Sequence, residues 1–99
     1  MNAVNIQTFL SETKNQKITI LDIRDKEAYL EDHFEGAISM PLTSVPNRLN
    51  ELDLDTHYYI LSHAGRRAQT IAHFLAKHGF QTTVVTGGMK ALRTMSMAS

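Results

Sequence analysis

"YILSHAGRRAQTIAHFLAKHGF" (residues 59–80) leads an apolar segment through a short polar loop into the clearest helical pattern of the chain. Residues 57–62 predict a buried strand because they form a short, largely apolar run. Between residues 66 and 78, apolar side chains recur at the spacing of one helix face, at Ala68, Ile71, Ala72 and Leu75. The stretch therefore predicts a strand, a loop and a helix in direct succession.

The rest of the chain repeats this alternation. We expect further strands at 18–23, 36–40 and 82–86, and helices at 6–12, 26–32, 44–52 and 89–95. The length of 99 residues is typical of one domain. The pattern predicts a single α/β domain over residues 1–99, with a mostly parallel central sheet of about five strands and helices on both of its faces. Ligands of such sheets bind beyond the carboxyl ends of the strands.

Several polar residues are placed to begin helices. Asn5 precedes the first helix, Asp25 precedes the second, and Ser44, with Pro46 in the first turn, precedes the third. Side chains of this kind accept hydrogen bonds from first-turn N–H groups, and proline is tolerated there. We therefore expect these three side chains to cap their helices.

The charge balance and hydropathy of the chain exclude several classes of partner. Ten basic and ten acidic side chains give a formal net charge of zero, so we expect no nucleic-acid partner. No apolar run approaches the ~20 residues that span a bilayer, and the first residues lack the pattern of a signal peptide. We expect no membrane partner and a cytoplasmic location.

Cysteine does not occur in these 99 residues. Disulfides, thiolate metal sites and cysteine-based catalysis are therefore excluded within this chain. The five histidines show no metal-binding spacing on one helix, and we expect no metal and no cofactor. His33 is expected to fix a turn rather than to bind a ligand.

The loop after the third predicted strand combines backbone N–H groups, the beginning of a helix and two arginines. Such a concavity binds anions. Arg66 and Arg67 lie in the first turn of the helix, where the macrodipole disfavours cations, so a negative group should face them. For one arginine we expect an ion pair with Asp22 or Asp25, and for the other a bound anion.

Ser62 begins this loop and has two interpretations. It is expected either to end the strand as a small polar residue or to act as a nucleophile. A serine nucleophile needs a positioned base, and adjacency in sequence does not place His63 within hydrogen-bond reach. The segment also lacks the Gly-x-Ser-x-Gly pattern of a hydrolase, which favours the structural role.

Three segments, in this order, resemble the rhodanese-like domain family. The first is "LDIRDKEAYLEDHFEGAISMP" (21–41), similar to the family's Asp-x-Arg and His-x-x-Gly-Ala motifs. The second is residues 59–80, similar to the strand, active-site loop and helix of the family. The third is "VVTGGMKAL" (84–92), similar to its closing Gly-Gly segment. The resemblance covers about three-quarters of the chain and implies the fold of that family.

The resemblance also implies a chemistry and a site. Rhodanese-like domains transfer sulfane sulfur through a persulfide on a loop cysteine, which the loop amides cradle, and Asp-x-Arg typically braces the loop. Here Ser62 stands at the position of that cysteine, and Asp22 and Arg24 match the bracing pair. The implied anion-binding loop has the six-residue length of the sulfurtransferases and consists of Ser62, His63, Ala64, Gly65, Arg66 and Arg67.

A hydroxyl cannot carry a persulfide, so the family's chemistry is in question at Ser62. The leading hypothesis is a domain without sulfurtransferase activity that binds a thiosulfate-, sulfate- or phosphate-like anion, or a protein partner. The alternative is an active sulfurtransferase in which Ser62 replaces a natural cysteine. A third class is a serine-dependent or phosphatase-like hydrolase.

Overall fold

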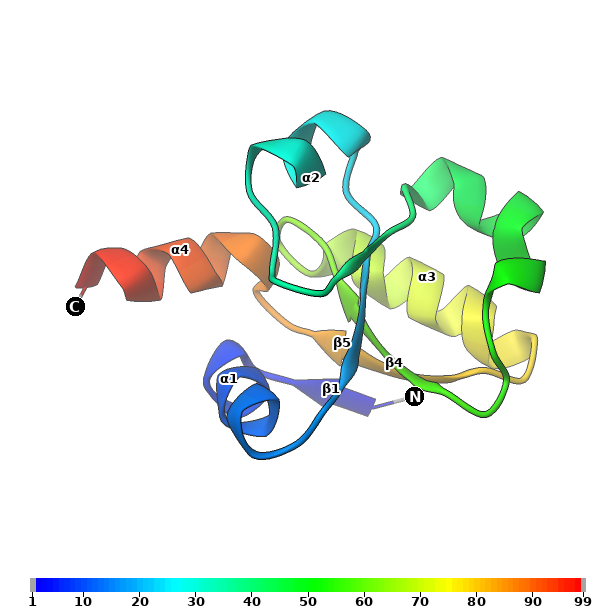
Figure 1. Ribbon diagram of the computed structural model, residues 1–99, viewed down its shortest axis with the longest axis horizontal. Coiled ribbons are helices and arrows are strands. Elements are labelled where there is room, and N and C mark those ends of the chain that lie inside the picture. The colour runs from blue at the N-terminus through cyan, green and yellow to red at the C-terminus, as the bar shows by residue number, and fades with distance from the viewer. Residues whose placement is uncertain (1, 99) are drawn as a thin grey trace.

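A five-stranded parallel sheet forms the centre of the computed structural model, which describes residues 2–98 and the side chains of residues 2–95 (Figure 1). Its strands are β1 (Asn2–Val4), β2 (Thr19–Asp22), β3 (Ile38–Ser39), β4 (His57–Leu61) and β5 (Gln81–Val85). They lie in the order β1-β5-β4-β2-β3, and every neighbouring pair is parallel. The α/β class and the parallel sheet are confirmed. β1 is an addition, because the sequence predicts no strand before the first helix.

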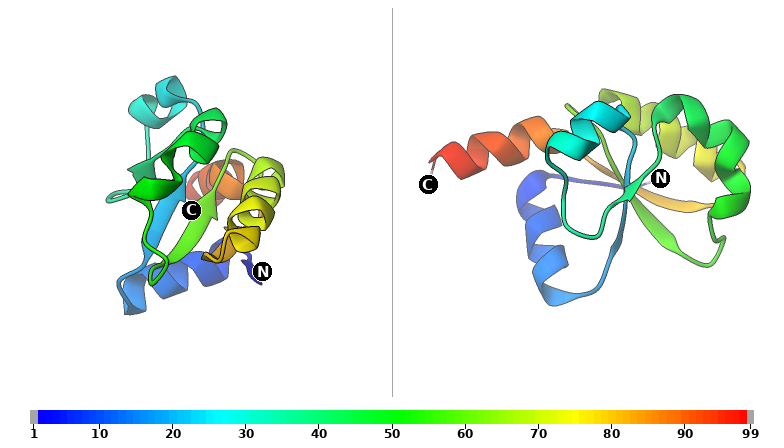
Figure 2. Two further views of the ribbon diagram at one scale, coloured as in Figure 1. Left: turned by 90° about the vertical axis from the view of Figure 1, so that its right-hand side faces the viewer. Right: turned by 45° about the horizontal axis from the view of Figure 1, so that its top comes forward.

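Helices cover both faces of the sheet, as expected (Figure 2). They are α1 (Ile6–Asn15), α2 (Lys26–Glu31), the 3-10 helix η1 (Leu42–Glu51), α3 (Arg66–Lys77) and α4 (Gly88–Ala98). α1 and α4 pack on one face, whereas α3 and η1 pack on the other. In the described part of the chain, no helix is both long and apolar enough to cross a membrane.

The central strand β4 divides its side chains between the two cores. Tyr58 and Ile60 belong to the core under α3 and η1, whereas Tyr59 and Leu61 belong to the core under α1 and α4. This follows from the two-residue period of a strand that is covered on both faces. β4 is thereby fixed from both sides, and the segment that follows Leu61 leaves the sheet at a defined place.

The predicted helix beginnings are only partly correct. Asn5 caps α1, since its side-chain oxygen accepts a hydrogen bond from the Thr8 N–H at 2.8 Å. Asp25 precedes α2 but makes no side-chain capping bond. η1 begins at Leu42, two residues before the predicted cap, because Pro41 O already accepts bonds from the N–H and the hydroxyl of Ser44. Pro46 consequently lies inside the helix.

Candidate functional site

The loop of residues 62–65 leaves the carboxyl end of β4 and turns directly into α3. Ser62 is buried, and its Oγ accepts a hydrogen bond from the Gly65 N–H at 2.9 Å. Gly65 has φ +95°, a left-handed conformation that glycine adopts readily, and α3 begins at the next residue. The Ser62 side chain therefore closes the turn and keeps its own O–H available for a further acceptor.

A glycine pair after β5 holds this loop from behind. The Met89 N–H donates to Ser62 O at 2.9 Å, and the Lys90 N–H donates to His63 O at 2.8 Å. A Cβ on Gly88 would lie 2.2 Å from Ser62 O, so only glycine permits this approach. The first turn of α4 thus fixes two loop carbonyls. The sequence marks these glycines only as a Gly-Gly segment that resembles the family's, and it does not reveal this bracing role.

Most of the other N–H groups at this loop have no hydrogen-bond acceptor among the described residues. In the chain as described, the N–H groups of His63, Ala64, Arg66 and Arg67 donate no hydrogen bond to protein. They stand at the amino end of α3, where the helix dipole adds partial positive charge. A group of unpaired donors at this place suits a small anion.

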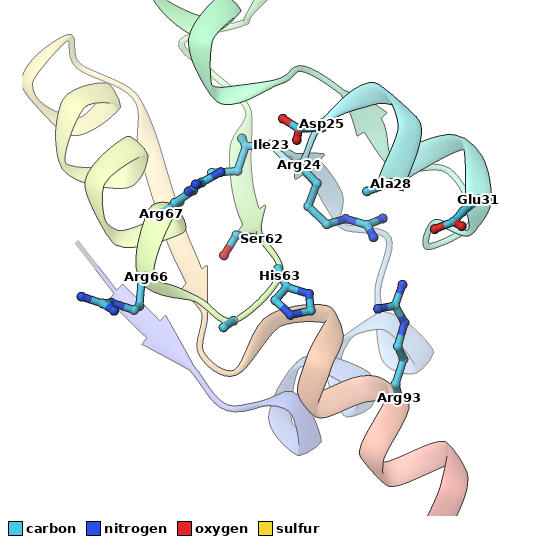
Figure 3. Close-up of a pocket in the computed structure, with 11 residues that line it drawn as sticks. Ile23, Arg24, Asp25, Ala28, Glu31, Ser62, His63, Arg66, Arg67 and Arg93 are labelled. Carbon is cyan, nitrogen blue, oxygen red and sulfur yellow. The ribbon is translucent and has the colours of Figure 1, made fainter.

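A cavity of about 430 Å³ opens in front of the loop (Figure 3). Five of the six predicted loop residues line it, and Gly65 does not. The loop contributes Ser62, His63, Ala64, Arg66 and Arg67, and the facing wall contributes Ile23, Arg24, Asp25, Ala28 and Glu31. Arg93 of α4 completes the lining. The structure therefore brings the two predicted motifs, residues 22–25 and 62–67, to the same cavity.

Asp22 and Arg24 form a buried ion pair at the base of this wall. Arg24 Nη2 lies 2.7 Å from Asp22 Oδ2, and the Arg24 Nε and backbone N–H both donate to Asp22 Oδ1. The hydrogen bond to Asp22 raises the pKa of the Arg24 guanidinium. The Ile23 N–H donates to Leu61 O at 3.0 Å and so joins this segment to the last residue before the loop. Direct bracing of the loop by this pair stays a prediction.

The predicted ion pair of a loop arginine with Asp22 or Asp25 is wrong. Neither Arg66 nor Arg67 makes a salt bridge within the described residues, and both are exposed. The Asp22 carboxylate is fully buried and already occupied by Arg24. Both loop arginines therefore keep their charge for a ligand or for solvent.

Arg93 and Asp32 form a contact that the sequence does not reveal. Arg93 Nη2 donates to Asp32 Oδ1 at 2.8 Å, although the two residues are 61 positions apart. Arg24 Nη1 lies 3.8 Å from the same oxygen. The hydrogen bond from Arg93 lowers the pKa of the Asp32 carboxyl. This contact holds the Arg93 side chain beside the cavity.

The histidines provide neither a serine base nor a metal site in the described chain. Ser62 Oγ makes no hydrogen bond to a histidine, and no three His, Asp or Glu side chains gather as ligands. His33 bonds through Nδ1 to Tyr29 O at 2.8 Å and stacks on the Tyr29 ring, contacts with the preceding helix α2, and its role in fixing the turn that follows stays a prediction. Ser62 therefore has the surroundings of a turn residue.

Comparison with known proteins settles the family. A model of the rhodanese-like domain matches residues 5–94. The chain belongs to the rhodanese-like domain family. A crystal structure of a rhodanese-like domain protein from Staphylococcus aureus superposes with a TM-score of 0.87 at 25% identity, covering 92% of this chain and 90% of the other.

Two relatives of this rhodanese-like domain have names that refer to sulfur carriage or sulfur transfer. It is 33% identical over 89 residues to "Putative sulfur carrier protein YrkF" of Bacillus subtilis, covering 88% of this chain and 48% of that protein. It is 30% identical to "Thiosulfate sulfurtransferase GlpE" of Pseudomonas entomophila, covering 76% of this chain and 70% of the relative. The chain thus spans about half the length of the first relative and most of the second.

Proposed function

We propose that this rhodanese-like domain binds a small oxyanion in the loop of residues 62–67 and does not transfer sulfur. One observation supports the proposal: four N–H groups of the loop have no acceptor in the described chain, while the side chain that begins the loop is the Ser62 hydroxyl. Thiosulfate, sulfate and phosphate share the tetrahedral oxyanion that such donors recognise. A protein partner for this surface and a cytoplasmic location remain predictions.

The chemistry of Ser62 favours binding over sulfur transfer. A sulfurtransferase cycle needs a thiolate that accepts a sulfane sulfur and later releases it. A serine hydroxyl is scarcely ionised at neutral pH and cannot form a persulfide. Because the Ser62 oxygen already accepts from the Gly65 N–H, its own O–H is the group left to donate to an anion.

Arg67 is the strongest test residue for anion binding. It lies in the first turn of α3, lines the cavity and forms no salt bridge in the described chain. A hydrogen bond from a charged donor contributes about 1.5–3 kcal/mol when it is sheltered, and less at an exposed site such as this. We expect Arg67→Ala to weaken sulfate binding about two- to fivefold.

Titration calorimetry with sulfate and thiosulfate at constant ionic strength measures this effect. Arg48→Ala is the matched control, because Arg48 is also partly exposed but pairs with Glu51 away from the cavity. The proposal expects binding in the unsubstituted protein, the loss in Arg67→Ala and no change in Arg48→Ala. Absence of sulfate and thiosulfate binding in the unsubstituted protein, or equal losses in both variants, would contradict it. So would thiocyanate formation from thiosulfate and cyanide.

A second candidate is an active sulfurtransferase whose natural residue 62 is cysteine. The Gly65 N–H is directed at the γ atom of residue 62, where it would stabilise a thiolate, and the relatives are named for sulfur carriage and transfer. The thiolate of a cysteine at this position would take the sulfane sulfur of thiosulfate and release sulfite. Cyanide would then remove that sulfur as thiocyanate and restore the thiolate.

Ser62→Cys tests this second candidate. The variant is expected to gain an alkylation-sensitive thiol of lowered pKa and to form thiocyanate, whereas the Ser62 protein forms none. Ser62→Ala is the control for any hydroxyl-dependent hydrolase activity and should change no phosphatase or esterase rate. A thiol of ordinary reactivity, without thiocyanate formation, would show that the loop no longer supports the chemistry of the family.

A further inference from the structure

The cavity is much larger than the anion that its loop would hold. It measures about 430 Å³, whereas a sulfate-sized ion occupies roughly the space of two or three water molecules at ~30 Å³ each. Cavities of roughly 300–1,000 Å³ are typical of organic ligands. Most of this volume therefore lies outside the reach of the loop donors.

The wall of the cavity that faces the loop contains apolar as well as charged side chains. Ile23 and Ala28 line it on one side, and Ala64 lines it on the loop side. These side chains cannot hydrogen-bond to an oxyanion, but they can contact a hydrocarbon body. An organic anion fits this lining better than an inorganic ion does.

A second cationic group stands apart from the loop arginines. In Figure 3 the Arg93 side chain rises from α4 toward the cavity on the far side of His63 from Ser62, whereas Arg67 lies on the near side. Arg93 donates through Nη2 to Asp32, and its guanidinium has further N–H groups for a second acceptor. Asp32 thus orients the Arg93 side chain, and the other N–H groups of the guanidinium stay available to a ligand.

The other charged groups of the cavity make Arg93 the place for a second anionic head. Among the described residues, Arg24 directs both Nε and Nη2 at the buried Asp22 carboxylate, whereas Arg93 gives only Nη2 to the half-exposed Asp32 carboxylate and keeps its other N–H groups. Asp25 and Glu31 line the α2 side and would repel a carboxylate. A second negative group is therefore best placed at Arg93.

We propose that the cavity takes an organic dianion, with a sulfonate-type head in the loop of residues 62–67 and a carboxylate at Arg93. The hydrocarbon between the two heads lies on Ile23, Ala28 and Ala64. This inference rests on the proposed anion binding by the loop, and it names the class of ligand that the loop serves.

Affinity measurements with two matched series of ligands test the proposal. One series is the alkanesulfonates, and the other is the sulfoalkanoates with two to five methylenes, which add a terminal carboxylate. In the unsubstituted protein, at least one sulfoalkanoate is expected to bind about fivefold more tightly than the alkanesulfonate of the same length, the upper range for an exposed ion pair. Arg93→Leu is expected to remove this preference, whereas Arg48→Leu keeps it.

The outcomes separate this proposal from the one on which it rests. If sulfate and propane-1-sulfonate bind but no sulfoalkanoate binds more tightly, the dianion is wrong and the loop site stands. A preference that survives in Arg93→Leu would equally overturn the assignment to Arg93. If neither sulfate nor any organosulfonate binds, the loop proposal fails and this one fails with it. The ligand comparison needs no variant, so it decides the case even where Arg93→Leu does not fold.

Discussion

Gly88 is the position where one added methyl group tests how the loop is held. Gly88 has φ +56°, and its ideal Cβ would lie 2.2 Å from Ser62 O and 2.7 Å from His63 O. Both neighbours are backbone atoms, so no side chain can turn aside to make room. Gly88→Ala must therefore displace either the loop or the first turn of α4.

Gly36 provides the matched control for backbone strain. It has φ +83°, but nothing lies within 4 Å of its ideal Cβ. Alanine at either position incurs the left-handed strain of about 1–2 kcal/mol. Alanine at Gly88 should lose a further ~1–3 kcal/mol of stability through overpacking, and up to about 1 kcal/mol for each weakened hydrogen bond from Met89 N and Lys90 N. The difference between the variants should be about 1–5 kcal/mol in the free energy of unfolding.

Urea unfolding followed by circular dichroism measures both variants against the unsubstituted protein. We expect Gly88→Ala to lose clearly more stability than Gly36→Ala and also to lose sulfate affinity, whereas Gly36→Ala keeps that affinity. Failure to purify Gly88→Ala because it does not fold would also agree with the larger loss, since the free energy of unfolding of a domain is only about 5–15 kcal/mol. Equal losses at Gly88 and Gly36 would refute the proposed docking of α4 on the loop.

Three further predictions concern the charged and phenolic groups. Asp22→Asn should destabilise the fold by about 3–5 kcal/mol in urea unfolding, because it leaves the buried Arg24 guanidinium without its counter-charge; a loss below about 1 kcal/mol would show that the pair is dispensable. Tyr59 donates to the Glu12 carboxylate, which raises the pKa of its phenol to about 12. This stabilisation is complete below the ordinary phenol pKa and is lost as the pH rises through about 12, so ultraviolet titration should show one late tyrosine that titrates earlier in Glu12→Gln. The hydrogen bond from Arg93 lowers the pKa of the Asp32 carboxyl, so it stabilises the fold above the ordinary carboxyl pKa, and this stabilisation is lost as the pH falls through the lowered pKa. Carbon NMR should show the pKa of Asp32 rising in Arg93→Leu.

The central part of the fold is readable from the sequence because its signals are local. The strand predicted at 57–62 and the helix from Arg66 follow from an apolar run and a helical period, and the structure confirms both, with the strand ending one residue earlier, at Leu61. β1 escapes prediction because it has three residues and gains its strand character from pairing with β5, as in Val4 beside Val85. The 3-10 helix η1 begins early because Pro41, rather than Ser44, sets its first turn.

The candidate site is predictable where a motif marks it and not where contacts cross the chain. The loop and the Asp-x-Arg segment stand out as motifs, and they do meet at one cavity. The Arg93–Asp32 contact joins residues 61 positions apart and carries no local signal. The predicted pairing of a loop arginine fails for a different reason, because Asp22 is buried and pairs with Arg24, its near neighbour in sequence.

The most direct test is a titration of the ¹⁵N-labelled protein with sulfate at constant ionic strength, followed by the backbone amide resonances. If the loop of residues 62–67 holds the anion, the amides of His63, Ala64, Arg66 and Arg67 should shift together along one saturable curve. The amides of Arg48 and Glu51, beside an exposed ion pair away from the cavity, should not follow that curve. Shifts that are non-saturable, or that are equal at Arg48 and in the loop, would contradict anion binding by the loop.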